Sequence, residues 1–428
     1  MDIRSYHGSW NERDYWYIAS DGRPLIFYAP EYKLALALNS PNLDVVARSG
    51  LPSFILERLA RREPIAPITP PATAFHLGLG LTRDCTLACR YCHADAGRRQ
   101  VISRNTLQKT IDYAFGRAKS TPKRVLSVSF AVGGEPTLEW DLFTTTVLAL
   151  KERAHEVNRV FLSMTTNGYY NDIKRRFIAD NFDVVTVSLD GPPSIHDLHR
   201  PTRAGRPSYD AVAETVKFLV AAGSVRIAVR ATVSAMSAPL LPMIVEHFVE
   251  QFGTAITISF EPLVKIGRAA ANDDATVPDM TVYTNNFLEA RRIGRSLGVH
   301  VTSSGASIRR LVARFCGAMA IPSFAVCIDG RVTACHRDQD AVDYGYGQIT
   351  PTGEIVIDES RLEGLARLND LPPQCSTCFA KWHCAGDCPD LRRIGWSRCE
   401  FNRALVYDDI ERAFAKGGDN TNAECRRR

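Results

Sequence analysis

Residues 75–93 read FHLGLGLTRDCTLACRYCH, an apolar run that turns directly into a cysteine motif. The β-rich part (75–82) is followed by the spacing C-x3-C-x2-C, at Cys85, Cys89 and Cys92. Three thiolates are one short of the four that ligate a complete iron–sulfur cube, and an open coordination position is typical of a catalytic metal site. The alternative is a structural zinc site with His93 as its fourth ligand.

Five more apolar runs of the same kind follow along the chain. They are rich in β-branched residues and lie at 125–134, 160–168, 184–191, 225–233 and 256–263. Amphipathic stretches such as 105–119 and 209–223 separate most of them, which indicates a parallel sheet with helical crossovers. We therefore expect an α/β fold with a partial (β/α)6 barrel, whose chemistry lies at the carboxyl ends of the strands.

The two ends of the chain differ from this alternating middle. In residues 1–73, the runs 14–20 and 24–30 predict a hairpin, and helical spacing follows before a proline-rich stretch at 64–72. Residues 306–428 contain few apolar runs and are rich in cysteine and in turn-forming residues. We predict three parts: an N-terminal α+β unit (1–73), the barrel (74–305) and a cysteine-rich domain (306–428). The first part is either a packing extension or a substrate-docking module.

Composition narrows the function classes. Among 428 residues, Lys and Arg exceed Asp and Glu by 52 − 47 = 5, which is too little to indicate nucleic-acid binding. No apolar run approaches the roughly 20 residues of a membrane helix, and the first residues lack a signal core. We expect a cytoplasmic protein with reduced thiols, so its 12 cysteines predict metal or catalytic sites. Cys425, beside the basic Arg426–Arg428, is expected to be a tail thiol.

The first cysteine motif, with Tyr91 just before its third cysteine, resembles the radical S-adenosylmethionine (SAM) superfamily. The resemblance implies a 4Fe-4S cluster on Cys85, Cys89 and Cys92, with SAM chelating the fourth iron. Reductive cleavage of SAM would yield a 5′-deoxyadenosyl radical that abstracts hydrogen from the substrate. In this arrangement the cofactor carries the chemistry, while the protein orients it and excludes water.

Further motifs at the ends of the predicted strands fit the same family. The resemblance assigns SAM contacts to residues of GGEP after the second strand, of TNG and SLDG after the third and fourth, and of an HD…R run. Arg230, on the fifth strand, is a candidate partner for a carboxylate. The candidate cofactor-binding residues are Tyr91, Gly133, Gly134, Glu135, Asn167, Ser188, Asp190, Arg200 and Arg230.

The second cysteine group resembles the SPASM extension of radical SAM enzymes. Its order is Cys316, Cys327, Cys335, Cys375, Cys378, Cys384, Cys388 and Cys399, with Gly330 in a G-x4-C motif before Cys335. The resemblance implies two auxiliary 4Fe-4S clusters, making three in all. One would use Cys316, Cys327, Cys335 and Cys388, and the other Cys375, Cys378, Cys384 and Cys399. Two structural zinc sites are the alternative.

The resemblance also implies a peptide substrate, since SPASM-bearing enzymes mostly modify peptides or proteins. Sulfatase-maturating members, which form formylglycine, carry an Asp directly after the G-x4-C cysteine, where this chain has His336. We therefore predict a maturase that cross-links a ribosomally made precursor peptide, as a cyclophane, C–C or thioether bond. His336, Asp338 and Glu261 are candidate general bases.

The same residues allow other functions, and they indicate which partners to expect. Formylglycine formation, dehydrogenation of a small alcohol and a zinc-bound binding protein are the alternative functions. The expected partners are the precursor peptide and a one-electron donor such as flavodoxin or ferredoxin, with neither nucleic acid nor membrane. Residues 1–73 loosely resemble the winged-helix element that binds a leader peptide as an added strand.

Overall fold

A computed structural model describes residues 2–38, 43–48, 50–68, 73–309, 311–320 and 323–416. The chain divides into two compact units. Unit 1 comprises residues 1–70, 304–320 and 367–428, and unit 2 comprises 71–303 and 321–366. This division groups the N-terminal segment with the C-terminal cysteines, and the three parts predicted from sequence stay a prediction. Cys425 and Arg426–Arg428 lie outside the described residues.

Unit 2 contains the predicted partial barrel, which is confirmed. The six predicted strands are β5 (Ala74–Gly80), β6 (Val125–Val132), β7 (Arg159–Thr166), β8 (Val184–Ser188), β9 (Arg226–Val233) and β10 (Ile256–Pro262). They pair in parallel in this sequential order. The short strand β11 (His300–Thr302) extends the sheet beyond β10, and β12 (Phe324–Val326) pairs in parallel with β5 at the other end.

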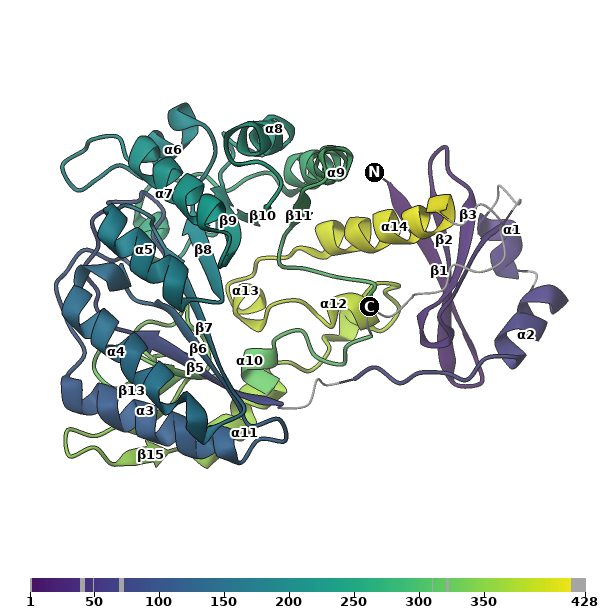
Figure 1. Cartoon of the computed structure of the whole chain (residues 1–428). Coiled ribbons are helices and arrows are strands. Elements are labelled where there is room, and N and C mark those ends of the chain that lie inside the picture. The colour runs from purple at the N-terminus through teal and green to yellow at the C-terminus, as the bar shows by residue number, and fades with distance from the viewer. Residues whose placement is uncertain are drawn as a thin grey trace. The chain divides into compact units, whose positions relative to one another are not determined.

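Helices connect the parallel strands, as the amphipathic stretches predict. They are α3 (Arg104–Lys119), α4 (Trp140–Glu152), α5 (Asp172–Asn181), α6 (Pro193–His199), α7 (Tyr209–Ala222), α8 (Leu241–Phe252) and α9 (Met280–Leu297). Figure 1 shows α3, α4, α5 and α7 along one face of the strands. The longer helices bury apolar stripes: α7, for example, buries Val212, Val216 and Leu219. It ends at Gly223, whose φ of 64° suits a left-handed cap.

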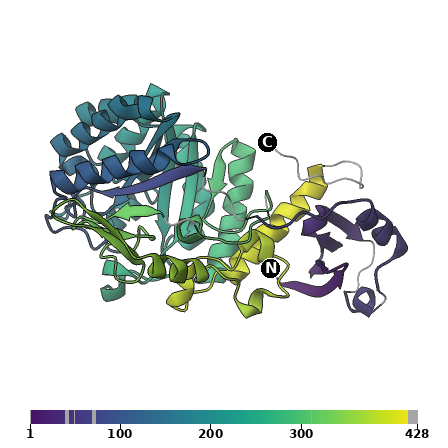
Figure 2. The same cartoon turned by 90° about the horizontal axis from the view of Figure 1, so that it is seen from below.

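The sheet continues past β12 through three antiparallel strands. These are β13 (Arg331–Thr333), β14 (Gly345–Ile349) and β15 (Ile355–Ile357), followed by α11 (Glu359–Arg367). β14 and β15 are adjacent and antiparallel, so they form a hairpin at the end of this extension. Figure 2 shows this extension from below.

Unit 1 is built around an antiparallel sheet of four strands in sequential order. These are β1 (Ile3–Trp10), β2 (Arg13–Ser20), β3 (Leu25–Ala29) and β4 (Leu34–Leu38), so the predicted hairpin is present as β2 and β3. Tyr17 and Phe27 face a cluster that includes Ile55 and Leu59 of α2 (Ser53–Ala60), and α1 (Leu43–Arg48) contributes Val46. Because strand residues alternate in direction, their neighbours point to the other face.

That other face packs against the cysteine-rich segment. Trp16, Ile18, Ile26 and Tyr28 share a buried cluster with residues of α12 (Lys381–Cys384) and α14 (Cys399–Lys416). The Trp16 indole N–H donates to the carbonyl of Thr377 at 2.8 Å. The N-terminal sheet therefore supplies apolar cover that the short helix α12 cannot provide for itself. Unit 1 also contains the short helices α10 (Gly317–Ala320) and α13 (Pro389–Arg393).

Candidate active site and auxiliary cysteine site

The cysteine loop after β5 is held against the Gly133–Gly134 turn after β6. The backbone N–H of Gly134 donates to the carbonyl of Thr82 at 2.7 Å, and that of Glu135 donates to the carbonyl of Asp84 at 2.8 Å. A Cβ on Gly134 would lie 2.0 Å from the Asp84 carbonyl oxygen. Glycine is therefore required for this close approach of two backbones.

The Glu135 carboxylate is buried and lies between the ends of β6 and β7. Its oxygens accept hydrogen bonds from the backbone and hydroxyl of Thr137, the hydroxyl of Thr166 and the backbone N–H of Asn167 at 2.7 Å. Burial raises the pKa of Glu135, and these donors act in the opposite direction. The side chain thus joins two strand ends behind the turn that Gly133 and Gly134 form.

Asn167 connects the end of β7 to the first cysteine. Its side-chain N–H donates to Cys85 Sγ at 3.5 Å and to the hydroxyl of Thr86 at 2.9 Å. Its carbonyl oxygen accepts from the backbone N–H of Tyr169 at 2.8 Å, which fixes the amide orientation. A donor aimed at sulfur stabilises the thiolate form, the form that ligates iron.

Asp190, after β8, organises the region around Tyr91. Its carboxylate accepts a hydrogen bond from the Tyr91 hydroxyl and lies 3.0 Å from Nε of Arg200. The backbone N–H of Thr232 donates to its other oxygen at 2.9 Å. Burial would raise the pKa of Asp190, but Arg200 and His199 hold it below its ordinary value. Asp190 is therefore ionised in a fully buried position.

Cys85 faces a donor at the end of β7, and Cys89 faces one at the end of α6. Arg200 Nη1 lies 4.0 Å from Cys89 Sγ, within hydrogen-bonding reach of a sulfur. Burial raises the pKa of Cys85 to about 12 and that of Cys89 to about 11. Because such thiols do not ionise unaided at neutral pH, metal binding and the nearby donors must stabilise the thiolates. Cys92, half-buried, completes the motif, and the three thiols fit an iron–sulfur cluster.

Three further candidates lie along neighbouring strands. Ser188 pairs with Arg230 in the register of β8 and β9, and Glu261 on β10 pairs with Thr232, two residues beyond Arg230. The side chain of Arg230 is exposed and forms no hydrogen bond or ion pair with any residue that the structure describes, while its backbone carbonyl accepts from the N–H of Leu189 at 3.0 Å. The structure thus places Ser188 beside Arg230, and Glu261 one strand away.

His336 and Asp338 lie in the loop after β13, in different settings. His336 is exposed, and its carbonyl accepts from the Gln339 side chain at 2.5 Å. The carboxylate of Asp338 accepts from the backbone N–H groups of residues 342, 343 and 344, at 3.0, 3.1 and 2.7 Å. The Thr333 hydroxyl adds a longer bond of 3.4 Å. Asp338 thus holds its own loop together.

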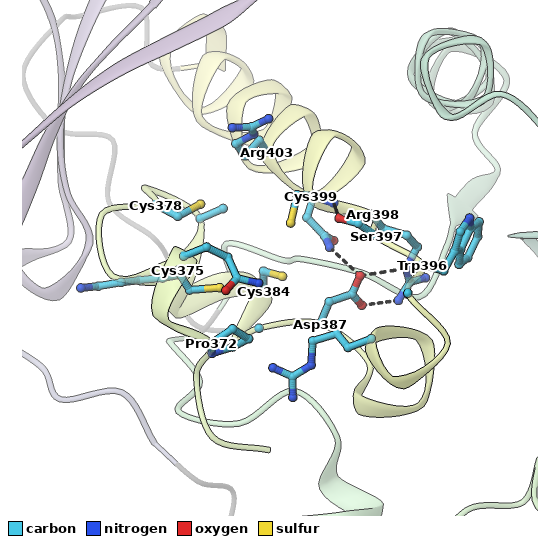
Figure 3. A pocket seen from close by; sticks show the side chains of 17 residues that line it. Pro372, Cys375, Cys378, Cys384, Asp387, Trp396, Ser397, Arg398, Cys399 and Arg403 are labelled. Carbon is cyan, nitrogen blue, oxygen red and sulfur yellow. Dashed lines mark hydrogen bonds and ion pairs between the residues drawn. The ribbon is translucent and has the colours of Figure 1, made fainter. Parts of the chain in front are cut away.

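Within unit 1, one predicted set of auxiliary ligands surrounds a single cavity. Cys375, Cys378, Cys384 and Cys399 all line a space of about 220 Å³ (Figure 3). Burial raises the pKa of Cys375 to about 11 and that of Cys384 well above its ordinary value. A cavity bounded by four thiols fits a thiolate-ligated iron–sulfur cluster.

The other predicted set is divided between the two units. Cys316 and Cys388 belong to unit 1, where Asn369 brackets Cys316 with hydrogen bonds to its backbone N–H and carbonyl. Burial raises the pKa of Cys316, and nearby Cys388 adds to the effect. Cys327 and Cys335 belong to unit 2, where Cys327 directly follows β12 and Cys335 lies just after β13. This set stays a prediction.

The described residues contain neither a single-ion metal site nor a membrane-spanning helix. No three His, Cys, Asp or Glu side chains in them converge on a single-ion site. A 4Fe-4S cube takes one thiolate at each iron, so its ligands need not converge in this way. Among the helices of the described part of the chain, none is both long and apolar enough to cross a membrane.

Comparisons with known proteins agree with this site. The sequence model of the Radical SAM superfamily matches residues 79–236. A cysteine-type anaerobic sulfatase-maturating enzyme of Clostridium perfringens is 32% identical over 138 residues, which cover 30% of this chain and 36% of that relative's length. A serine-type enzyme of Klebsiella aerogenes is 24% identical over 76% of this chain and 82% of its own.

Solved structures share the fold at low identity. The sulfatase-maturating enzyme anSMEcpe, solved with AdoMet and a Cp18Cys peptide, has a TM-score of 0.62 at 18% identity, covering 80% of this chain and 98% of its own. Streptococcus suis SuiB bound to its precursor peptide SuiA has a TM-score of 0.53 at 14% identity. The match covers 77% of this chain and 75% of the SuiB chain. Through the family match, residues 79–236 are assigned to a radical SAM domain, and that family uses a 4Fe-4S cluster and SAM.

Sequence reasoning missed several residues that shape these sites. Asp387, Arg398 and Asn402 are buried and polar, and each bonds to another part of a site. A signal was present for two of them, because Asp387 directly precedes Cys388 and Arg398 directly precedes Cys399. Their pairing could not be read from sequence, since it depends on how the two segments meet.

Proposed function

We propose that this chain is a radical SAM enzyme that oxidatively modifies a ribosomally made precursor peptide by joining two of its side chains. The bound cluster and SAM supply the radical that removes a hydrogen atom from the substrate. Enzyme activity with oxidative radical chemistry is supported by the family. The peptide substrate is supported by anSMEcpe and SuiB, both of which were solved with peptides.

The proposal gives the residues of unit 2 distinct roles. Cys85, Cys89 and Cys92 hold the cluster, while Asn167 and Arg200 donate toward two of its sulfurs. The Gly133–Gly134 turn offers backbone to SAM, supported from behind by Glu135. Asp190 holds Tyr91 and Arg200 in place from the end of β8.

One observation favours cross-linking over formylglycine formation. In the sulfatase-maturating pattern an Asp follows the G-x4-C cysteine, and His336 occupies that place here. The nearest carboxylate in sequence, that of Asp338, accepts hydrogen bonds from three backbone N–H groups and a hydroxyl of its own loop. These bonds engage both of its oxygens within the loop. If a base is needed, His336 or Glu261 is the better candidate.

Formylglycine formation is the second candidate function, because the sulfatase-maturating enzymes are the curated relatives that match this chain. Two variants separate the roles of the loop residues. Asp338→Asn should weaken the loop while leaving product identity unchanged. His336→Gln should slow product formation at unchanged SAM cleavage if His336 is the base.

The remaining parts of the proposal concern electrons and peptide recognition. Two auxiliary clusters would accept the electron released when the substrate radical becomes a closed-shell product, and a flavodoxin or ferredoxin would supply the first electron. In unit 1, β1 is an edge strand, and an extended leader peptide could add to it as a further strand.

Anaerobic turnover followed by mass spectrometry tests the proposal. The reaction contains reconstituted enzyme, SAM, a reductant and a short peptide encoded beside this protein, with Cys89→Ala as the inactive control. Loss of two hydrogens, 5′-deoxyadenosine, and missing fragment ions between two residues would establish a cross-link. An aldehyde-trapping adduct would establish formylglycine instead. Zinc in place of iron in the purified protein, with no 5′-deoxyadenosine, would refute radical chemistry.

A further inference from the structure

A buried ion pair joins the residues that precede two different cysteine ligands in unit 1. Nε of Arg398 lies 3.0 Å from one carboxylate oxygen of Asp387, and Nη2 lies 2.5 Å from the other. The exposed fractions of the two side chains are only 2% and 8%. A two-point contact between a guanidinium and a carboxylate fixes orientation as well as distance.

Each partner is also fixed by the surrounding backbone. Arg398 Nη1 donates to the carbonyl and hydroxyl of Ser304, at 2.6 and 2.9 Å. Asp387 accepts from the backbone N–H of Cys388 at 2.7 Å and from the Asn402 side chain at 3.1 Å. The pair therefore connects the Cys388 backbone, the first turn of α14 and the segment that begins at residue 304.

The loop that carries Asp387 has an unusual backbone. Ala385, Gly386 and Asp387 all have positive φ, of 47°, 81° and 63°, between the ligand candidates Cys384 and Cys388. Left-handed conformations are costly for residues with a side chain, and they persist where the surroundings over-determine them. The hydrogen bonds of Asp387 supply that constraint, so the side chain sets the path between two cysteines.

The pair also borders the cavity that Cys375, Cys378, Cys384 and Cys399 surround, as Figure 3 shows. The charged residues that line this cavity are Lys381, Asp387, Arg392, Arg398 and Arg403. Asp387 is the single anion among these lining residues, and it neutralises Arg398. A cube with a 2+ core and four thiolates carries a net charge of about −2, which a cationic wall stabilises.

We propose that Asp387 and Arg398 are a positioning pair that fixes the loops bearing Cys388 and Cys399 and sets the reduction potential of the cluster in this cavity. The inference rests on the proposed auxiliary cluster. Net charge near an iron–sulfur cluster is one of the main determinants of its potential. Removing the anion should favour the reduced cluster, and removing the cation should favour the oxidised cluster.

The test is a potentiometric titration of the full-length, anaerobically reconstituted protein, followed by electron paramagnetic resonance. Asp387→Asn should raise the potential of one cluster and Arg398→Gln should lower it. At a fixed solution potential, each single substitution should change the ratio of reduced to oxidised cluster on the order of tenfold. For a one-electron couple, this change corresponds to a shift of about 59 mV in the reduction potential. The double variant should lie between them. A purely structural role would shift both single variants in the same direction, through greater exposure of the cluster.

Asp409→Asn is the matched control. Asp409 is also buried, and it forms an ion pair with Arg412. It lies ten residues beyond Cys399 along α14, about 15 Å by helix rise. Its substitution should leave the potential unchanged. If the charge variants fail to retain iron, Arg398→Lys is the second variant, because it keeps the charge and loses the two-point contact. A reduction potential equal to that of the wild type then supports the proposal, and a lowered reduction potential overturns it. The proposal is also overturned if Asp387→Asn and Arg398→Gln shift the reduction potential in the same direction, or if they retain their iron and leave the potential unchanged. Zinc in the wild-type cavity would instead refute the auxiliary cluster itself.

Discussion

The guanidinium of Arg200 lies over the ring of Tyr91, with its central carbon 5.2 Å from the ring centre. Asp190 binds both groups, so an aromatic residue placed between two cluster ligands is tied to the end of β8. A cation over an aromatic face, with a carboxylate beside both, is a rigid arrangement in a buried setting. It gives the cysteine loop a fixed position relative to the barrel strands.

Asp190→Asn should destabilise unit 2 and impair SAM cleavage. The substitution leaves the Arg200 cation buried without its carboxylate, and breaking a buried pair in this way costs about 3–5 kcal/mol of unfolding free energy. Denaturant unfolding and 5′-deoxyadenosine formation measure the two effects. Glu289→Gln removes an exposed ion pair with Arg292 and is the control, expected to change neither. An Asp190 variant of wild-type stability would contradict the assignment.

Gly134→Ala should reduce the iron bound at the first motif. The added methyl group would collide with the Asp84 carbonyl, so the loop before Cys85 must move. Iron content and visible absorbance of the reconstituted protein measure the loss. Gly116→Ala is the matched control, because its new Cβ on α3 meets no atom within 4 Å. That helical substitution should stabilise the protein by about 0.5–1 kcal/mol, and equal iron in the two variants would refute the prediction.

The stability of the barrel should fall as the pH drops from about 6.5 toward 4, in part through His196. Burial lowers the pKa of this imidazole to about 4, against the weaker opposing effect of Asp190. In that window the unfolded chain takes up a proton that the folded chain does not, so acid favours unfolding, by about 3 kcal/mol over the full window. His196 accepts from the backbone N–H of Asp190 and donates to Ser208.

Thermal unfolding midpoints under argon, measured from pH 4 to 7, test this contribution. His196→Gln should flatten the pH dependence relative to the wild type, even if it lowers stability at pH 7. His155→Gln alters an exposed histidine and should leave the wild-type slope in place. Identical slopes in all three proteins would show that His196 does not contribute.

Trp16→Ala should release auxiliary iron while the first cluster persists. Trp16 is fully buried against the cysteine-rich segment, and such a truncation costs about 3–5 kcal/mol. If three clusters are present, iron should fall from about twelve atoms per chain toward about four to eight. SAM cleavage should continue. Phe54→Ala, on the exposed side of α2, is the control. Loss of SAM cleavage together with the auxiliary iron would contradict this assignment.

Much of unit 2 could be predicted from the sequence alone. The six strands have near-continuous apolar runs because both faces of the sheet are covered, and the helices between them have apolar stripes of helical period. Parallel order then brings the carboxyl ends together, so the motifs that follow β5 to β8 were expected on one rim. The cysteine sets were implied by the resemblance to radical SAM and SPASM motifs, and they stay a prediction.

Contacts between distant segments could not be predicted in this way. The sequence singled out Glu135 as a chemical candidate, yet its carboxylate accepts from Thr166 and Asn167, which only folding brings near. It also did not predict that the sheet of residues 3–38 covers the segment around Cys384, more than 340 residues away. Local pattern determined the strands, helices and ligand spacing, because each depends on neighbours in the chain. Tertiary structure decided which polar groups remain available and which charges meet, since burial and pairing depend on segments that no local pattern relates.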